Sequence, residues 1–272
     1  MQKYKDFIKR IFAHGRQVTS CIMCAVLIFC MLPATAFADG TEGGTPSRVA
    51  EFYFSSNNKV NVKNYTAGFW AYGTSSGITK QNVESLPASG WNWALQADYE
   101  AGEYTIRLNN YNGQAVGSSV IELGSAPCKL TMDISGTNVI NASNYGMRFS
   151  ECNMTLQGSG SLSITTDQTT AGIEVRSLAV DLTSGKKLAV DITAEQENVS
   201  STSGISTDAF VLNSGTVSVK AKREAEDVQG YEGVKGIKSK SITVNDGSLT
   251  VTAENANGHA YAIWGDRVRN AD

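Results

Sequence analysis

Hydrophobic and polar residues alternate along much of the chain beyond residue 100, in short runs that end at glycine. In residues 130–134, Leu, Met and Ile alternate with Thr and Asp, and Gly136 follows. Similar runs cover residues 154–156, 162–164, 178–182, 188–192, 210–212, 217–221, 242–244 and 249–253. A period of two places aliphatic side chains on one face of a strand and polar ones on the other. The pattern predicts an all-β fold of many short strands joined by turns.

A step from glycine to an aliphatic residue, or a similar step, recurs through these runs. Its aliphatic members are Ile121, Met147, Ile173, Ile205, Ile237 and Ile263. They lie 26, 26, 32, 32 and 26 positions apart. Near-equal spacing of this kind indicates a repeat in which each unit stacks on the next.

The length of the repeat predicts an architecture. A coil of about 26 residues with three short strands can close on itself and stack on the next coil at about 4.8 Å. Stacking buries the aliphatic faces in one continuous column. We therefore predict a parallel β-helix, or solenoid, over residues 114–272. A β-sandwich is the alternative, although its alternating strands do not require a repeating register.

The predicted register brings two cysteines together. Cys128 stands two positions before Leu130, and Cys152 stands two positions before Met154. Stacking would place their Cα atoms about 5 Å apart, within the range that a disulfide spans. We predict a Cys128–Cys152 bridge, with two free, semi-buried thiols as the alternative.

The position after each step carries mostly polar residues. These are Glu122, Arg148, Glu174, Ser206, Lys238 and Trp264. We predict that the first three form a ladder of alternating charge on one outer face. An arginine between carboxylates could also belong to an active site. We favour a structural role, because opposite charges on neighbouring strands attract each other and help to fix the strand register.

The two longer repeats carry their extra residues in the segments 195–203 and 222–235. Adjacent coils would set these loops side by side as a raised, mostly acidic ridge. The candidate ligand-binding residues are Arg223, Glu224, Glu226, Asp227, Tyr231, Glu232 and Trp264. Solvated loop charge without a ligand is the alternative.

Residues 51–113 differ from the repeats in composition. They hold twelve aromatic residues, against six in all that follows. A solenoid must cover the open end of its apolar column, so we predict a β-rich aromatic cap here. Aromatic rings that stack on sugars are the alternative.

The first 38 residues have the organisation of a signal peptide. Five basic residues precede an apolar run at 21–32, and the triplet Ala36-Phe37-Ala38 follows. Cleavage after Ala38 would leave a flexible leader over residues 39–50. An uncleaved membrane anchor is the alternative, although the run is shorter than the roughly 20 residues of a spanning helix.

Composition restricts the function of the mature chain. Removing five basic residues and one acidic residue leaves 18 basic and 25 acidic residues, a formal charge of −7. This charge argues against nucleic acid and anionic membranes as partners, and no second long apolar run predicts a membrane span. His259 is the one histidine left, so a Ser-His-Asp triad would depend on it and a His/Cys zinc site lacks ligands. We predict no catalytic and no metal-binding residue.

The last step, at Ile263, opens a coil that the sequence does not complete. An open solenoid end exposes an unpaired strand edge. We expect either that the chain is a fragment of a longer surface protein or that its last coil is disordered.

Four segments carry a resemblance to a known family. They are Asn109-Asn110-Tyr111-Asn112-Gly113, Ile134-Ser135-Gly136-Thr137-Asn138, Gly158-Ser159-Gly160-Ser161-Leu162 and residues 236–251. Together with the repeat, they make residues 95–263 similar to bacterial extracellular right-handed β-helix proteins. Those proteins are similar in fold to pectate lyases, and some are described as carbohydrate-binding domain proteins. The resemblance implies a right-handed helix and an extracellular location. Calcium-dependent members carry paired Asp residues at the coil start, where this chain has Ser-Gly-Ile or Lys-Gly-Ile, so we expect no calcium or other cofactor.

These patterns lead to two hypotheses of function. The first is a secreted or cell-surface, non-catalytic module for adhesion or structure, a rigid rod with host or bacterial glycans as candidate ligands. The alternative is a polysaccharide lyase or glycoside hydrolase of the β-helix fold, with its site on the ridge at residues 195–235. Hydrolases require two facing carboxylates, which the scattered Asp133, Asp181 and Asp191 do not provide.

Overall fold

The computed structural model describes residues 48, 51–54, 59–115, 120–123, 126–167, 171–194, 202–223, 233–255, 258–265 and 267–270. Over these residues the protein is all-β, with one 14-stranded and one 6-stranded sheet and no helix. The same residues accordingly include no apolar helix long enough to cross a membrane. The predicted signal peptide and almost all of the predicted leader lie outside the described residues.

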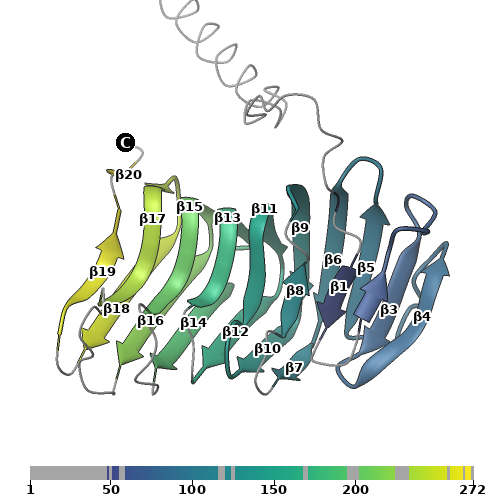
Figure 1. Ribbon diagram of the computed structural model, residues 1–272, viewed down its shortest axis with the longest axis horizontal. Helices are drawn as coiled ribbons and strands as arrows, with labels where there is room; N and C mark the ends of the chain where they lie inside the picture. Colours follow the sequence, from purple (N-terminus) through teal and green to yellow (C-terminus); the bar gives the residue numbers. More distant parts are fainter. Residues whose placement is uncertain are drawn as a thin grey trace, which may run out of the picture. The chain divides into compact units, whose positions relative to one another are not determined.

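The first strands pair in antiparallel fashion at one end of the 14-stranded sheet (Figure 1). They are β1 (Glu51–Phe54), β2 (Lys59–Asn61), β3 (Trp70–Thr74), β4 (Gly77–Val83) and β5 (Trp93–Asp98). β1 pairs with β2 and with β8 (Ile121–Leu123), and β3 pairs with β4 and β5. β5 in turn pairs with β6 (Glu103–Asn109).

The repeats form parallel ladders in both sheets (Figure 1). The larger sheet contains β6 (Glu103–Asn109), β8 (Ile121–Leu123), β9 (Cys128–Ser135), β11 (Met147–Gly158), β13 (Ala171–Leu182), β15 (Thr202–Ser214), β17 (Val234–Val244), β19 (Ala260–Trp264) and β20 (Arg267–Asn270). The smaller sheet contains β7 (Asn112–Ala115), β10 (Thr137–Ala142), β12 (Ser161–Thr166), β14 (Lys187–Ala194), β16 (Thr216–Arg223) and β18 (Ser248–Asn255). From β9 to β18, each repeat therefore contributes one strand to each sheet.

The lateral register predicted from the repeat is confirmed. The aligned step residues are Ile121 with Met147, Met147 with Ile173, Ile173 with Ile205, Ile205 with Ile237, and Ile237 with Ile263. The longer spacings of 32 residues do not disturb this alignment, because the described strands on either side of the extra residues stay in register. The strands before them, β14 and β16, are in register from Lys187 to Ala194. The strands after them are again in register from Thr202 onward.

Four repeats have one long bent strand (β11, β13, β15 or β17) and one short strand, where the sequence predicted three short strands. In the repeat before them, β8, β9 and β10 are three separate short strands. In β13 the alternation of buried and outward residues runs to Val175 and then breaks, because Arg176 and Ser177 both face away from the core. Alternation resumes at Leu178. β15 and β17 show the same break. Two of the predicted strands are therefore one strand that bends.

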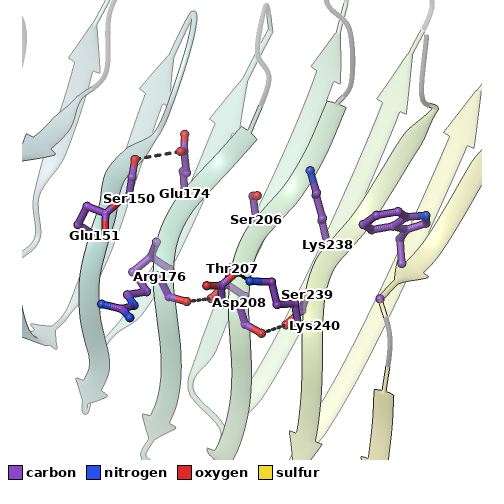
Figure 2. A pocket seen from close by; sticks show the side chains of 13 residues that line it. Ser150, Glu151, Glu174, Arg176, Ser206, Thr207, Asp208, Lys238, Ser239 and Lys240 are labelled. Carbon is purple, nitrogen blue, oxygen red and sulfur yellow. Dashed lines mark hydrogen bonds and ion pairs between the residues drawn. The ribbon is translucent and has the colours of Figure 1, made fainter. Parts of the chain in front are cut away.

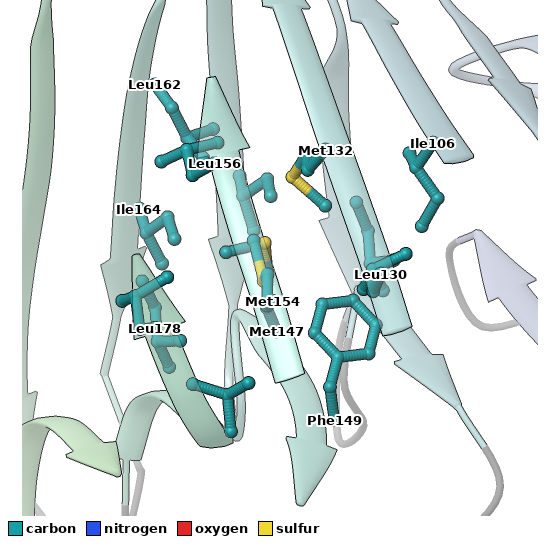
Figure 3. Packing of buried hydrophobic residues seen from close by; sticks show 14 of the residues in the cluster. Ile106, Leu130, Met132, Met147, Phe149, Met154, Leu156, Leu162, Ile164 and Leu178 are labelled. Atoms are coloured by element: carbon teal, nitrogen blue, oxygen red, sulfur yellow. The ribbon is translucent and has the colours of Figure 1, made fainter. Parts of the chain in front are cut away.

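Aliphatic side chains of successive repeats lie in line between the sheets (Figure 3). Leu130, Met154 and Leu178 are register partners on β9, β11 and β13, and each is at most 2% exposed. Leu162 and Ile164 of the smaller sheet are buried in the same cluster. Each fully buried side chain of this kind contributes about 1.5–3 kcal/mol. The column predicted from the period of two is thus the core of the protein.

The aromatic residues of the N-terminal region belong mainly to the core. Phe54 stacks on Trp93 with ring centroids 4.1 Å apart, and Phe52 packs against Tyr104 at 4.9 Å. All four are at most 3% exposed. These rings are not available to a ligand, which favours the structural role predicted for them over sugar stacking.

Parallel pairing starts before the predicted boundary at residue 114. β6 already pairs in parallel with β9, from Glu103 with Lys129 to Asn109 with Ser135. β7 pairs in parallel with β10 from Asn112 onward. Residues 103–113 therefore belong to the ladders and join them directly to the antiparallel strands.

Candidate functional site

A groove of about 550 Å³ crosses the outer face of the larger sheet. Its size lies within the range of about 300–1,000 Å³ that is typical of ligand sites. Strands β11, β13, β15, β17 and β19 all contribute to it (Figure 2). The lining residues are Ser150, Glu151, Glu174, Val175, Arg176, Ser206, Thr207, Asp208, Lys238, Ser239, Lys240, Trp264 and Gly265.

Two rows of outward side chains run along the groove. Glu174, Ser206, Lys238 and Trp264 are register partners in the position after the step. Arg176, Asp208 and Lys240 form the second row, three positions after Ile173, Ile205 and Ile237. The second row lies where the long strands bend, so the bends create the groove.

Buried hydroxyl groups hold two of these bends. The Thr207 hydroxyl lies 3.1 Å from the Arg176 carbonyl oxygen and 3.0 Å from that of Ala209, so it can donate to either. The Ser239 hydroxyl lies 3.3 Å from the Asp208 carbonyl oxygen and 2.7 Å from that of Ser241. Such bonds satisfy buried backbone oxygens at a point where the strand changes direction. They link each bend to the bend of the preceding repeat.

A bulge in β11 forms one end of the groove. Phe149 pairs with Val175 and Asn153 pairs with Ser177, so residues 150–152 lie opposite Arg176 alone. Extra residues of this kind re-aim side chains next to the ladder. They bring Ser150 and Glu151 into the groove lining, where the Ser150 hydroxyl donates to Glu174 Oε1 at 2.9 Å.

The disulfide lies in the same bulge. Cys152 is the register partner of Cys128, and the structure joins them by a disulfide with a Cα–Cα distance of 4.5 Å. Cys152 is 1% exposed and Cys128 is 7% exposed. The bridge ties the bulge of β11 to β9 directly beside the groove.

The charge ladder predicted at Glu122, Arg148 and Glu174 is present. Arg148 lies 3.5 Å from Glu122 and 3.7 Å from Glu174, measured between nitrogen and oxygen. The three side chains are 30–44% exposed, so each pair contributes about 0–1 kcal/mol. In the groove itself, Lys240 forms a 2.9 Å ion pair with Asp208.

Trp264 forms the other end of the groove, on β19. Its side chain is 44% exposed, more than any other large hydrophobic side chain among the described residues. Two ammonium groups lie near its ring centroid, that of Lys235 at 4.6 Å and that of Lys238 at 5.6 Å. Lys235 is 1% exposed, whereas Lys238 is only partly buried. Aromatic faces attract cations at these distances.

The candidate ridge is only partly within the described residues. Glu224, Glu226, Asp227, Tyr231 and Glu232 lie outside them. Arg223 is described and is 1% exposed, so its side chain is covered rather than presented on a surface. Of the predicted ligand-binding residues, Trp264 lines the groove and Arg223 does not. Trp264 lies there in one row with Lys238, Ser206 and Glu174.

Sequence reasoning did not find the Arg176–Asp208–Lys240 row or the Ser150–Glu151 bulge. The sequence did contain a signal for this row, because its three charged residues each lie three positions after the aliphatic residue of a step. The bulge breaks the period of two and leaves no signal of that kind.

The chemistry of the groove is that of charged, hydroxyl and indole groups. The described residues contain no group of three or more His, Cys, Asp or Glu placed to hold a metal ion. His259 lies outside the groove lining, with its ring 6.1 Å from that of Tyr261.

Comparisons with protein-family models, with curated proteins and with solved structures found no match.

Proposed function

We propose that the chain is an exported, right-handed parallel β-helix protein that acts as a non-catalytic surface or adhesion module and binds glycans in the groove. The observation that carries the binding role is the exposed Trp264 at the end of an open groove rich in hydroxyl and charged groups. Sugar-binding sites combine these features, because an aromatic face packs on a pyranose ring while polar groups bond its hydroxyls.

Strand order supports the β-helix. The larger sheet runs β9, β11, β13, β15, β17, and the smaller sheet runs β10, β12, β14, β16, β18. The chain adds a strand to each sheet alternately, and each new strand lies next to the previous strand of the same sheet. A chain that does so advances as a coil. Connections between parallel strands are right-handed in about 98% of cases, which supports the proposed hand.

Two features support export. The basic, apolar and small-residue segments of positions 1–38 follow the order that signal peptidase reads. A buried disulfide between Cys128 and Cys152 suits an oxidising compartment outside the cytoplasm.

Charge pairing in the groove suits a role in orienting a ligand. Two of the three groove carboxylates are paired, Asp208 with Lys240 and Glu174 with Arg148. We therefore propose that these groups orient a ligand.

A retention assay tests the proposal. The purified full-length chain is incubated with immobilised and free polysaccharides, both neutral and acidic, and the free polysaccharides are analysed for cleavage. We expect retention on at least one glycan with no unsaturated or reducing product. Product formation that Asp208→Asn abolishes would contradict the non-catalytic role, and absence of retention on every glycan would contradict the binding role.

A further inference from the structure

The groove is polarised along its length. Glu151 lies on β11, and Glu174 lies on β13 together with Arg176, whereas Lys238 and Lys240 lie on β17 (Figure 2). Trp264 follows on β19. Four spacings between neighbouring strands separate β11 from β19, a distance of about 19 Å. The acidic end and the tryptophan end are therefore too far apart to act on one sugar ring.

The two lysines differ in how their charge is balanced. Lys240 is neutralised by Asp208 at 2.9 Å. Lys238 has no carboxylate within ion-pair distance among the described residues, and its ammonium group lies 5.6 Å from the Trp264 ring centroid. Its side chain is only partly buried and lines the groove. Among the described residues, Lys238 thus presents a positive charge without an ion-pair partner beside an exposed indole.

We infer that the β17–β19 end of the groove binds an anionic sugar residue, a uronate or a sulfated ring. This inference rests on the proposed glycan-binding function and specifies its ligand class. The pyranose ring packs on Trp264, and its carboxylate or sulfate group accepts a charge-assisted hydrogen bond from Lys238.

Matched pairs of polysaccharides test the inference. The probes are hyaluronan with its carboxyl-reduced form, and carboxyl-reduced chondroitin sulfate with the same polymer after desulfation, so that one member of each pair is neutral. Each is titrated against the purified full-length chain at low and high salt. We expect the charged member of at least one pair to bind about tenfold or more tightly than its partner, with the difference falling as salt rises. The two pairs distinguish a carboxylate from a sulfate as the recognised group.

Variants assign the effect to the site. Lys238→Gln is expected to weaken binding of the charged probe about tenfold and to leave the neutral probe unchanged. Trp264→Ala is expected to weaken both probes several-fold, because it removes the ring contact. Lys220→Gln, which removes an exposed lysine from the smaller sheet, is the matched control and should bind like the parent.

Each other outcome has a defined meaning. Equal binding of charged and neutral probes would overturn the anionic inference and leave the proposed glycan binding intact. Preference for the charged probe that Lys238→Gln and Lys220→Gln reduce equally would overturn the assigned site. Absence of binding to every probe, in a chain that also binds no other glycan, would overturn both.

Discussion

At the bends of the long strands, single side-chain hydroxyl groups provide hydrogen bonds to backbone carbonyl oxygens. Thr207 and Ser239 are buried, and each has backbone carbonyl oxygens within hydrogen-bond distance. Tyr111 shows the opposite case. Its phenol oxygen is buried and has no hydrogen-bond partner among the described residues. Burial also raises the pKa of Tyr111, because the charged phenolate is poorly solvated inside the protein.

Tyr111→Phe should stabilise the protein. Removing an unsatisfied buried hydroxyl should raise the free energy of unfolding by about 1 kcal/mol at pH 7. Since the pKa of Tyr111 is raised in the folded state, its contribution is constant below the unfolded pKa of about 10 and declines as pH rises above it. The variant should therefore lose less stability than the parent between pH 9 and pH 11, as measured by urea unfolding.

Tyr53→Phe is the control for this prediction. The Tyr53 hydroxyl donates to Glu51 at 3.0 Å, so its removal should bring no gain in stability. A Tyr111→Phe protein less stable than the parent at pH 7 would show that the phenol has a partner in solution.

In the long strands, the glycine of the step allows the strand to pass close to the next repeat. A Cβ atom on Gly204 would lie 2.6 Å from the Gly236 carbonyl oxygen and would also meet the Val219 side chain. Gly172 is similarly placed, 2.9 Å from the Gly204 carbonyl oxygen. The step seen in the sequence therefore reflects close packing of backbone on backbone.

Gly204→Ala should destabilise the protein. Because a backbone oxygen must move to make room, we expect a loss of about 1–3 kcal/mol. Thermal unfolding would show this as a fall of several degrees. Ser206→Ala, two residues further along β15 and partly exposed, is the control and should change the melting temperature little. Equal effects of the two substitutions would contradict the packing argument.

The disulfide should stabilise the β9–β11 pair. Cys128 and Cys152 are 24 residues apart in sequence, and closing a loop of that length contributes about 3 kcal/mol. Reductant should therefore lower the melting temperature of the parent. The Cys128→Ala/Cys152→Ala double variant should melt at the lower temperature with or without reductant. The prediction would be contradicted if reductant left the melting temperature of the parent unchanged although both cysteines were shown to be reduced.

The sequence predicted the elements of the ladders better than the groove on them. Alternation and spacing were sufficient to align Ile173 with Ile205, because one buried face tolerates no slip in register. They did not reveal the bend. At the bend, two successive residues such as Arg176 and Ser177 face outward, and this interrupts the alternation of apolar and polar positions from which strands were predicted. The bulge at residues 150–152 was also missed, because it follows from packing between neighbouring repeats.

On the scale of the whole molecule, the two ends of the ladders differ. Antiparallel strands and buried aromatic rings cover the end at β6. At the other end, Ile263 is 37% exposed, whereas its register partner Ile237 is fully buried. Leu249 and Val251 of β18 are likewise only partly buried. Apolar contacts therefore diminish towards β18 and β19.

Backbone amides should exchange with solvent in the same order. Strand β13 has a neighbour on each side, while β19 pairs with β17 alone among the described strands. We expect amides of 260–264 to exchange at least about tenfold faster than those of 173–182, as measured by hydrogen–deuterium exchange with mass spectrometry. Equal protection of the two segments would show that β19 is covered in solution.

The bridge between Cys128 and Cys152 joins strands of consecutive repeats. A load that pulls on the C-terminal strands would unzip the ladders one repeat at a time, because each repeat contacts only its neighbours. Peeling would break backbone hydrogen bonds from β19 back to β13, and at β11 it would meet a covalent bond. The disulfide would then pass the load from Cys152 directly to Cys128, so that residues 129–151 between them would bear none of it.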